Sequence, residues 1–151
     1  MKLKISRIKE NGIELYQVRD EKNDRVYVIG EKIGIIKRKY ELYDGRKNFI
    51  ARITSDFSRK KYKFLENDIV IDELDLVPLK TPRQYKLSNH NWILNMDITF
   101  TEYSIHDENN QVLAEIRYNL PDNSWLIDIK TIKDITLIML MIITVISISQ
   151  N

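Results

Sequence analysis

The sequence contains no cysteine and only four glycines, three prolines and two histidines among its 151 residues. The absence of cysteine excludes disulfide bonds, thiolate metal sites and a cysteine nucleophile, and a reducing compartment such as the cytoplasm is expected. The start of the chain, MKLKI, is charged and alternating, so it does not resemble a secretory signal peptide. One domain of this length buries about 68–70% of its unfolded surface and needs no metal to fold.

The sequence is also poor in residues arranged for catalysis. Its glycines form no phosphate-binding loop, and no serine lies in a nucleophile-elbow motif. His90 falls in an expected loop, and His106 precedes Asp107, which would point to the opposite face of a strand. Both histidines are interpreted as structural or solvent-facing. We expect a protein that is not an enzyme and has no cofactor.

A short acidic segment contains Asp72, Glu73 and Asp75, with Asp68 nearby. These carboxylates could bind a hard cation weakly, but the segment lacks the glycine and the spacing of an EF-hand loop. The favoured interpretation is a solvated acidic turn, or a partner for basic residues elsewhere, and no metal site is predicted.

The net charge of +2 conceals an uneven distribution along the chain. Residues 1–63 contain 18 Lys and Arg against 9 Asp and Glu, whereas residues 64–151 contain 6 against 13. If each half formed one side of the fold, the molecule would be dipolar, with one basic face. Alternatively, the charges of the two halves pair with each other.

Short segments that alternate between apolar and polar residues occupy most of the chain, and their Ile, Val, Tyr, Phe and Thr residues favour strands. Turn signals rich in Asn, Asp and Gly separate many of them. Evenly spaced strands with tight turns predict a mainly β fold, a sandwich or a barrel. The segments are 2–8, 13–18, 25–29, 33–43, 49–53, 61–65, 69–79, 84–87, 92–105, 112–120 and 125–129.

The C-terminal segment 135–151 has no charged residue and is mostly apolar as far as residue 148. It is longer than a typical strand, so we predict a helix over about residues 132–149, entered near Asp134. A helix that is apolar nearly all round is either buried on every side or inserted in lipid. The run is slightly short for a membrane span, which favours a buried core helix over a membrane anchor.

Two segments of the chain align without gaps at an offset of 63 residues. Both describe a strand, a turn that begins at an aspartate, and a return strand. Two similar half-barrels would close into one ring without exposed edges, although unrelated hairpins also share turn chemistry. The matched pairs are Tyr40 with Tyr103, Leu42 with Ile105, Asp44 with Asp107, Ile50 with Leu113, Ala51 with Ala114, Ile53 with Ile116, and Tyr62 with Trp125.

The chain resembles the tubby C-terminal superfamily in three features taken together: this repeat, the strand-rich body and the terminal apolar helix. Its pattern is most similar to small bacterial relatives of the plant LURP-one-related proteins, with phospholipid scramblases as more distant kin. The resemblance implies one domain over residues 1–151. In that domain, about twelve antiparallel strands within residues 1–130 would close into a barrel around the central hydrophobic helix.

Tubby proteins bind phosphoinositides through basic residues on the barrel surface. The resemblance therefore implies a module that binds anionic phospholipid headgroups at the inner membrane face, where each Lys or Arg contributes about 1 kcal/mol. The alternative is that the basic clusters are solvated strand faces and turns. The candidate headgroup-binding residues are Lys37, Arg38, Lys39, Arg46, Lys47, Arg59, Lys60, Lys61 and Lys63.

Other functions stay open at this point. The uncharged C-terminal segment would serve a tail-anchored membrane protein. Tyr40, Tyr43 and Tyr62 interleave with cations and could stack on nucleic-acid bases, although tyrosines at strand spacing more often belong to a core or cover a sheet. Scramblase activity has no support in the residues, because the cysteine-rich and proline-rich segments of those relatives are absent. We expect a monomer, and the sequence identifies no protein partner.

Overall fold

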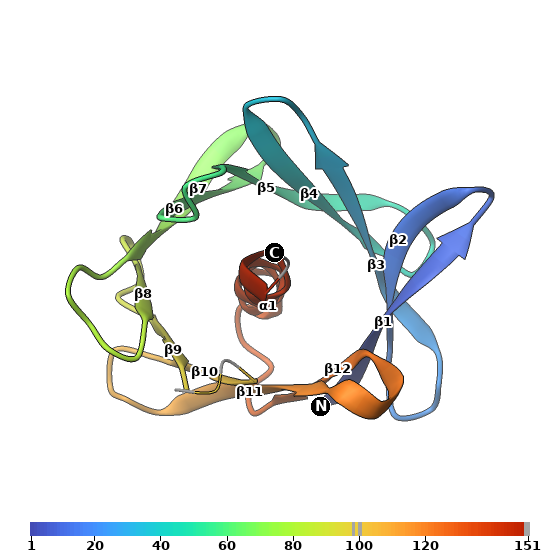
Figure 1. Cartoon of the computed structure of the whole chain (residues 1–151). Helices are drawn as coiled ribbons and strands as arrows, with labels where there is room; N and C mark the ends of the chain where they lie inside the picture. The colour runs from blue at the N-terminus through green and yellow to red at the C-terminus, as the bar shows by residue number, and fades with distance from the viewer. Residues whose placement is uncertain (98, 100, 150–151) are drawn as a thin grey trace.

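The computed structural model describes residues 1–97, 99 and 101–149, and within them twelve antiparallel strands surround one α-helix (Figure 1). This architecture confirms the predicted closed barrel around a C-terminal helix. The elements are β1 (Lys2–Glu10), β2 (Ile13–Arg19), β3 (Arg25–Ile33), β4 (Lys37–Asp44), β5 (Phe49–Asp56), β6 (Lys61–Glu66), β7 (Ile69–Leu76), β8 (Gln84–Leu87), β9 (Ile93–Met96), β10 (Glu102–His106), β11 (Val112–Asn119), a 3-10 turn (Leu120–Asp122), β12 (Ser124–Ile129) and α1 (Ile135–Ser149).

The first and last strands close the ring. β1 pairs with β2 on one side and with β12 on the other, and the remaining strands follow in chain order. The Ile129 amide also donates to the Met1 carbonyl at 2.8 Å, next to the β1–β12 pairing. Among the described residues every strand therefore has two partners, and no strand edge is open to another chain.

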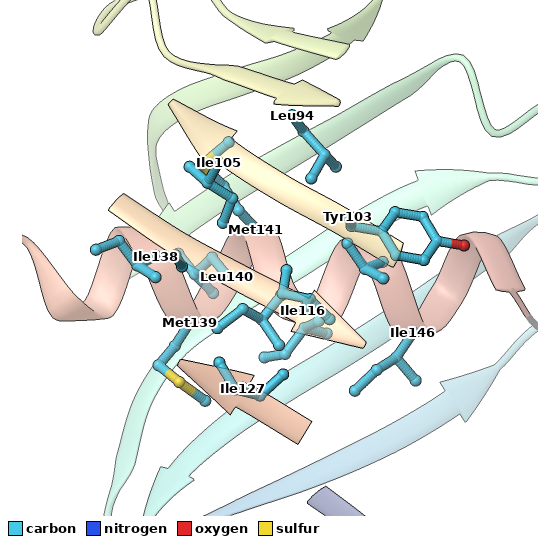
Figure 2. Packing of buried hydrophobic residues seen from close by; sticks show 14 of the residues in the cluster. Leu94, Tyr103, Ile105, Ile116, Ile127, Ile138, Met139, Leu140, Met141 and Ile146 are labelled. Carbon is cyan, nitrogen blue, oxygen red and sulfur yellow. The ribbon is translucent and has the colours of Figure 1, made fainter. Parts of the chain in front are cut away.

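Helix α1 runs through the centre of the barrel, where residues 137–148 are buried. Side chains from the surrounding strands point towards it, as Ile105 and Ile116 do in Figure 2. The polar Thr144 donates its hydroxyl to the Leu140 carbonyl at 3.0 Å, which satisfies it inside the core. The enclosing barrel explains why the helix is apolar on every side and confirms the predicted buried core helix. No helix in the described part of the chain is long and apolar enough to cross a membrane.

An aromatic side chain faces inward within the first four residues of each even-numbered strand. Within the described residues these are, from β2 to β12, Tyr16, Tyr40, Tyr62, Tyr85, Tyr103 and Trp125, and all are buried. We call them the aromatic ring. Ser147, close to the C-terminal end of α1, lies near the hydroxyl groups of Tyr40 and Tyr62. The C-terminal end of the helix therefore faces the loops that precede the even-numbered strands.

The hairpins β4–β5 and β10–β11 share the geometry that the 63-residue repeat predicts. Each contains a bulge directly after the buried aliphatic residue, Leu42 in one and Ile105 in the other. In each turn two backbone amides donate to the aspartate carboxylate at 2.9 Å, Asp44 in one and Asp107 in the other. Asp20 makes the same turn between β2 and β3 at 3.0 Å, so the motif occurs at least three times.

Segments 25–29 and 49–53 end before the strands that contain them, β3 and β5, and three other segments include residues of a loop or of two strands. Segment 92–105 contains the two strands β9 and β10. Segment 33–43 begins with the last residue of β3 and a loop at residues 34–36, and segment 69–79 continues three residues beyond the end of β7. The loops after β3 and β7 contain exposed apolar residues, so apolarity there does not report a strand.

Candidate functional site

Most of the predicted basic residues gather on neighbouring strands at one end of the barrel. The register places Lys39 of β4 opposite Thr54 of β5, and Thr54 opposite Lys63 of β6. Two strand spacings of about 4.8 Å therefore separate the backbones of these two lysines. Tyr40 and Tyr62 point into the core, so alternation turns their neighbours outward. The outward set consists of Lys37, Lys39, Lys61 and Lys63.

Arg38 and Arg59 take different positions from these lysines. Arg38 has the same parity as Tyr40 and faces the inner side of the strand, where its guanidinium lies 5.3 Å from the centre of the Phe57 ring. Arg59 lies in the β5–β6 loop with a φ of 58°. These arginines therefore belong to the opening of the barrel, and Arg38 does not extend the outer basic face.

Arg46 and Lys47 lie away from the other predicted residues, in the turn after the end of β4. Lys37 and Lys39 lie at the start of this eight-residue strand, so about 20 Å of extended chain separates the two groups. Lys47 forms an ion pair with Glu10, and this contact lowers the pKa of Glu10. The structure therefore does not bring Arg46 and Lys47 into the same cluster.

The acidic segment on β7 supplies partners for one of the outward lysines. Glu73 and Asp75 face outward and lie 3.3 and 3.7 Å from the Lys61 ammonium group. The hydrogen bond to Glu73 and the two negative charges raise the pKa of Lys61. Lys63 is directly opposite Glu73 in the register, but Glu73 contacts Lys61. Pairing between the basic and acidic parts of the chain therefore occurs, but only locally.

Several cations of the cluster form no ion pair with the described residues, although Lys37 lies opposite Asp56 in the register. In the part of the chain that the structure describes, no ion pair within 4.0 Å involves Lys37, Lys39, Lys60 or Lys63. Lys39 also lies directly opposite Lys32 of β3, which pairs with Glu41 at 2.9 Å. Opposed Cβ atoms are only about 4.5–5.5 Å apart, and the Glu41 carboxylate offsets part of the repulsion between the two lysines.

Three neighbouring loops extend this positive surface. They are residues 34–36 between β3 and β4, 57–60 between β5 and β6, and 77–83 between β7 and β8. Each leads from an odd-numbered to an even-numbered strand, so all lie at one end of the antiparallel barrel. The segments 33–40, 57–65 and 77–83 contain nine Lys and Arg residues and no Asp or Glu. We call these three segments the basic rim.

The β5–β6 loop of the basic rim is held in place by the neighbouring strands. The Leu76 amide at the end of β7 donates to the Lys60 carbonyl at 2.8 Å. The Tyr85 hydroxyl on β8 donates to the Arg59 carbonyl at 2.7 Å. One member of the aromatic ring thus positions a basic loop directly. The cations of this loop therefore project from a defined backbone.

The remaining candidates for chemistry have structural partners. Asp72, 1% exposed, faces inward and accepts hydrogen bonds from the Glu73 and Asn89 amides at 2.8 and 2.9 Å. His90 lies 2.6 Å from the same carboxylate through Nδ1. The described residues contain no group of three or more His, Asp or Glu side chains able to hold a metal ion. Asp72 and His90 together fix the loop between β8 and β9.

We predict that Asp72→Ala lowers the free energy of unfolding by about 3 kcal/mol, because it leaves buried amides without their acceptor. Urea denaturation measures this change. The matched control is Glu115→Ala, which removes an exposed carboxylate 3.8 Å from Lys130 and should change the stability by less than about 1 kcal/mol. Equal effects of the two substitutions would contradict the structural role of Asp72.

Sequence reasoning missed some residues of the site and placed others in the wrong environment. Lys32, Lys80 and Arg83 were not among the candidates, although Lys80 and Arg83 flank Pro82 in a segment that resembles a loop. The three tyrosines considered for base stacking are not free on the surface. Tyr40 and Tyr62 are buried, and the half-buried Tyr43 donates its hydroxyl to Glu41 at 2.9 Å.

Comparison with known proteins supports the architecture. No protein-family model matches the chain, and no curated protein matches it significantly. The X-ray structure of the protein AT5G01750 from Arabidopsis thaliana is similar, with a TM-score of 0.63 and 10% sequence identity. The alignment covers 95% of this chain and 89% of that protein. At this identity the likeness shows a shared fold, and the closed twelve-strand barrel fits the tubby-like fold that the sequence resemblance implied.

Proposed function

We propose that the chain is a non-enzymatic module that binds anionic phospholipid headgroups at a membrane surface through the basic rim. The observation that carries this proposal is the grouping of nine cations in the three segments of the basic rim, where the nearest acids are Asp56, opposite Lys37, and the Glu73 and Asp75 partners of Lys61. Phosphate esters are the complementary ligands, because each Lys or Arg near an anionic surface contributes about 1 kcal/mol. The site belongs to a peripheral protein at the inner membrane face.

The repulsion within the basic rim supports an anionic ligand. Lys39 and Lys63 lie on the same face two strands apart, and neither forms an ion pair with the described residues. A bound phosphate would offset this repulsion without any rearrangement of the barrel. Turns at the opposite end contain acids such as Asp20, Asp44 and Asp107, so that end would be repelled from the same surface.

We predict that Lys39→Gln combined with Lys63→Gln weakens binding to anionic vesicles about 30-fold at low salt, since two cations are removed at about 1 kcal/mol each. Co-flotation with vesicles of phosphatidylcholine and phosphatidylserine measures the affinity. A parallel series with phosphatidylinositol phosphates distinguishes a preference for the phosphorylated headgroup from a response to surface charge.

The control for net charge is Lys22→Gln combined with Arg46→Gln. These exposed residues lie in turns at the opposite end of the barrel, and they remove the same total charge. Both double variants are compared at an ionic strength of about 0.1 M, where the Debye length is about 10 Å and shorter than the roughly 20 Å that separates Arg46 from Lys39 along β4. The loss of Lys22 and Arg46 should then change the affinity less than about threefold. A similar loss of binding in both double variants would contradict a localised site.

A further inference from the structure

The three loops of the basic rim also carry exposed apolar side chains. Ile35 is 97% exposed and Ile36 72% exposed in the β3–β4 loop. Phe57 is 44% exposed in the β5–β6 loop, and Leu79 is fully exposed in the β7–β8 loop. Thus each loop at this side of the barrel combines an exposed apolar tip with cations. The β3–β4 and β7–β8 loops project from the ring in Figure 1.

The local backbone holds two of these tips away from the barrel. The Gly34 amide donates to the Lys37 carbonyl at 2.9 Å, so the turn closes at its base and leaves Ile35 and Ile36 outside. Leu79 has a φ of 61°, a left-handed conformation that is rare for a bulky residue. The apolar tips are therefore fixed features of the turns, and they do not fold back onto the core.

The arrangement of tips and cations fits a lipid surface better than a protein partner. A protein interface usually has a packed apolar core with a polar rim. Here separate apolar tips stand on three loops, each next to Lys or Arg, which is the distribution of groups that bind at a membrane interface. Cations contact the headgroups while apolar side chains enter the boundary of the acyl chains.

We propose that the barrel docks end-on to anionic membranes, with Ile35, Phe57 and Leu79 inserted at the boundary between headgroups and acyl chains. This inference rests on the proposed function and adds the orientation and the apolar anchor. α1 would then stand with its C-terminal end towards the membrane, still enclosed by the barrel.

The absence of native cysteine allows each position to be probed with a single dye. Leu79→Cys labelled with an environment-sensitive fluorophore should shift to shorter wavelength on phosphatidylserine vesicles and be quenched by lipid-borne quenchers. The control is Ile132→Cys, which replaces a side chain 88% exposed at the opposite end of the barrel. The fluorescence of the dye at position 132 should indicate an aqueous environment both with and without vesicles.

Two results would overturn end-on docking and are distinguishable from each other. If both labelled proteins bind vesicles but the dye at position 79 reports water, the headgroup-binding function stands and the insertion is wrong. If neither protein binds anionic vesicles, both proposals fail.

A second variant tests the apolar contribution without a dye. Ile35→Ser combined with Leu79→Ser should weaken vesicle binding at least about tenfold at high salt, where the lysine contribution is screened. Ile69→Ser combined with Ile132→Ser removes exposed apolar residues at the opposite end and should leave binding unchanged. Equal affinities of these two double variants would contradict the insertion.

Discussion

Replacing Ile142 with aspartate should abolish the folded state. Ile142 lies in the middle of α1 with no exposed surface, and the barrel encloses the helix on every side. The substitution loses the buried side chain and places an unpaired carboxylate in the core, at a combined cost on the order of 5 kcal/mol or more. This cost is comparable to the total stability of about 5–15 kcal/mol typical of such domains.

The measurement is far-UV circular dichroism with urea denaturation, and Ile142→Val is the matched control. Removing one methylene group should cost about 0.5–1.5 kcal/mol and preserve a cooperative transition. A cooperative, native-like transition in the aspartate variant would show that the helix is not essential to the core. A membrane-anchoring role for the helix would then regain support.

The barrel should unfold cooperatively as the pH rises from 10 to 12, because the tyrosines of the aromatic ring are buried. Burial raises the pKa of Tyr40, Tyr85 and Tyr103 to about 12 each, from an ordinary value of 10.0. Burial also raises the pKa of Tyr16 and Tyr62. A difference of two pH units corresponds to roughly 2–3 kcal/mol for each residue, so several together approach the whole stability.

The free energy of unfolding falls with rising pH because the unfolded state loses its tyrosine protons first. The unfolded chain ionises its tyrosines near pH 10, whereas the folded state retains these protons until about pH 12. The contribution to the free energy of unfolding is therefore fully present below pH 10 and is lost as the pH rises towards 12. Absorbance of tyrosinate and circular dichroism should change together.

Tyr40→Phe tests this mechanism at a single position. The Tyr40 hydroxyl is buried close to Ser147 and Glu31, so its removal should cost no more than about 1 kcal/mol at neutral pH. The alkaline loss of stability should then be smaller by roughly 2–3 kcal/mol. Gradual tyrosine ionisation near pH 10 without a change in secondary structure would contradict the burial of the ring.

The fold could be predicted because its signals are local and repeated. Alternating apolar and polar residues give each strand one inward and one outward face. The aspartates form the turns between strands, and the long apolar segment forms a helix that is buried on every side. The repeat was found only where its spacing was regular, at Tyr40 and Tyr103. The copy at Tyr16 lies 24 residues from Tyr40, so a single offset of 63 could not reveal it.

The candidate site was harder to predict because it depends on the register of the strands and on which face of the sheet each side chain occupies. Adjacent residues Arg38 and Lys39 have opposite orientations, and only the position of β4 in the sheet determines which one is outward. Lys61 and Lys63 share a face, yet only Lys61 contacts acidic side chains. A linear count of charge suggested two oppositely charged halves. The barrel instead groups alternate loops at one end.

The proposed membrane surface is the central functional claim, and flotation of the unmodified protein with vesicles tests it most directly. Neutral phosphatidylcholine vesicles are compared with vesicles containing phosphatidylserine, each at low and at high salt. The account predicts binding to the anionic vesicles alone, strongly weakened by salt, with a weaker component that remains when the charges are screened. Failure to bind anionic vesicles at low salt, or equal binding to neutral vesicles, would contradict it.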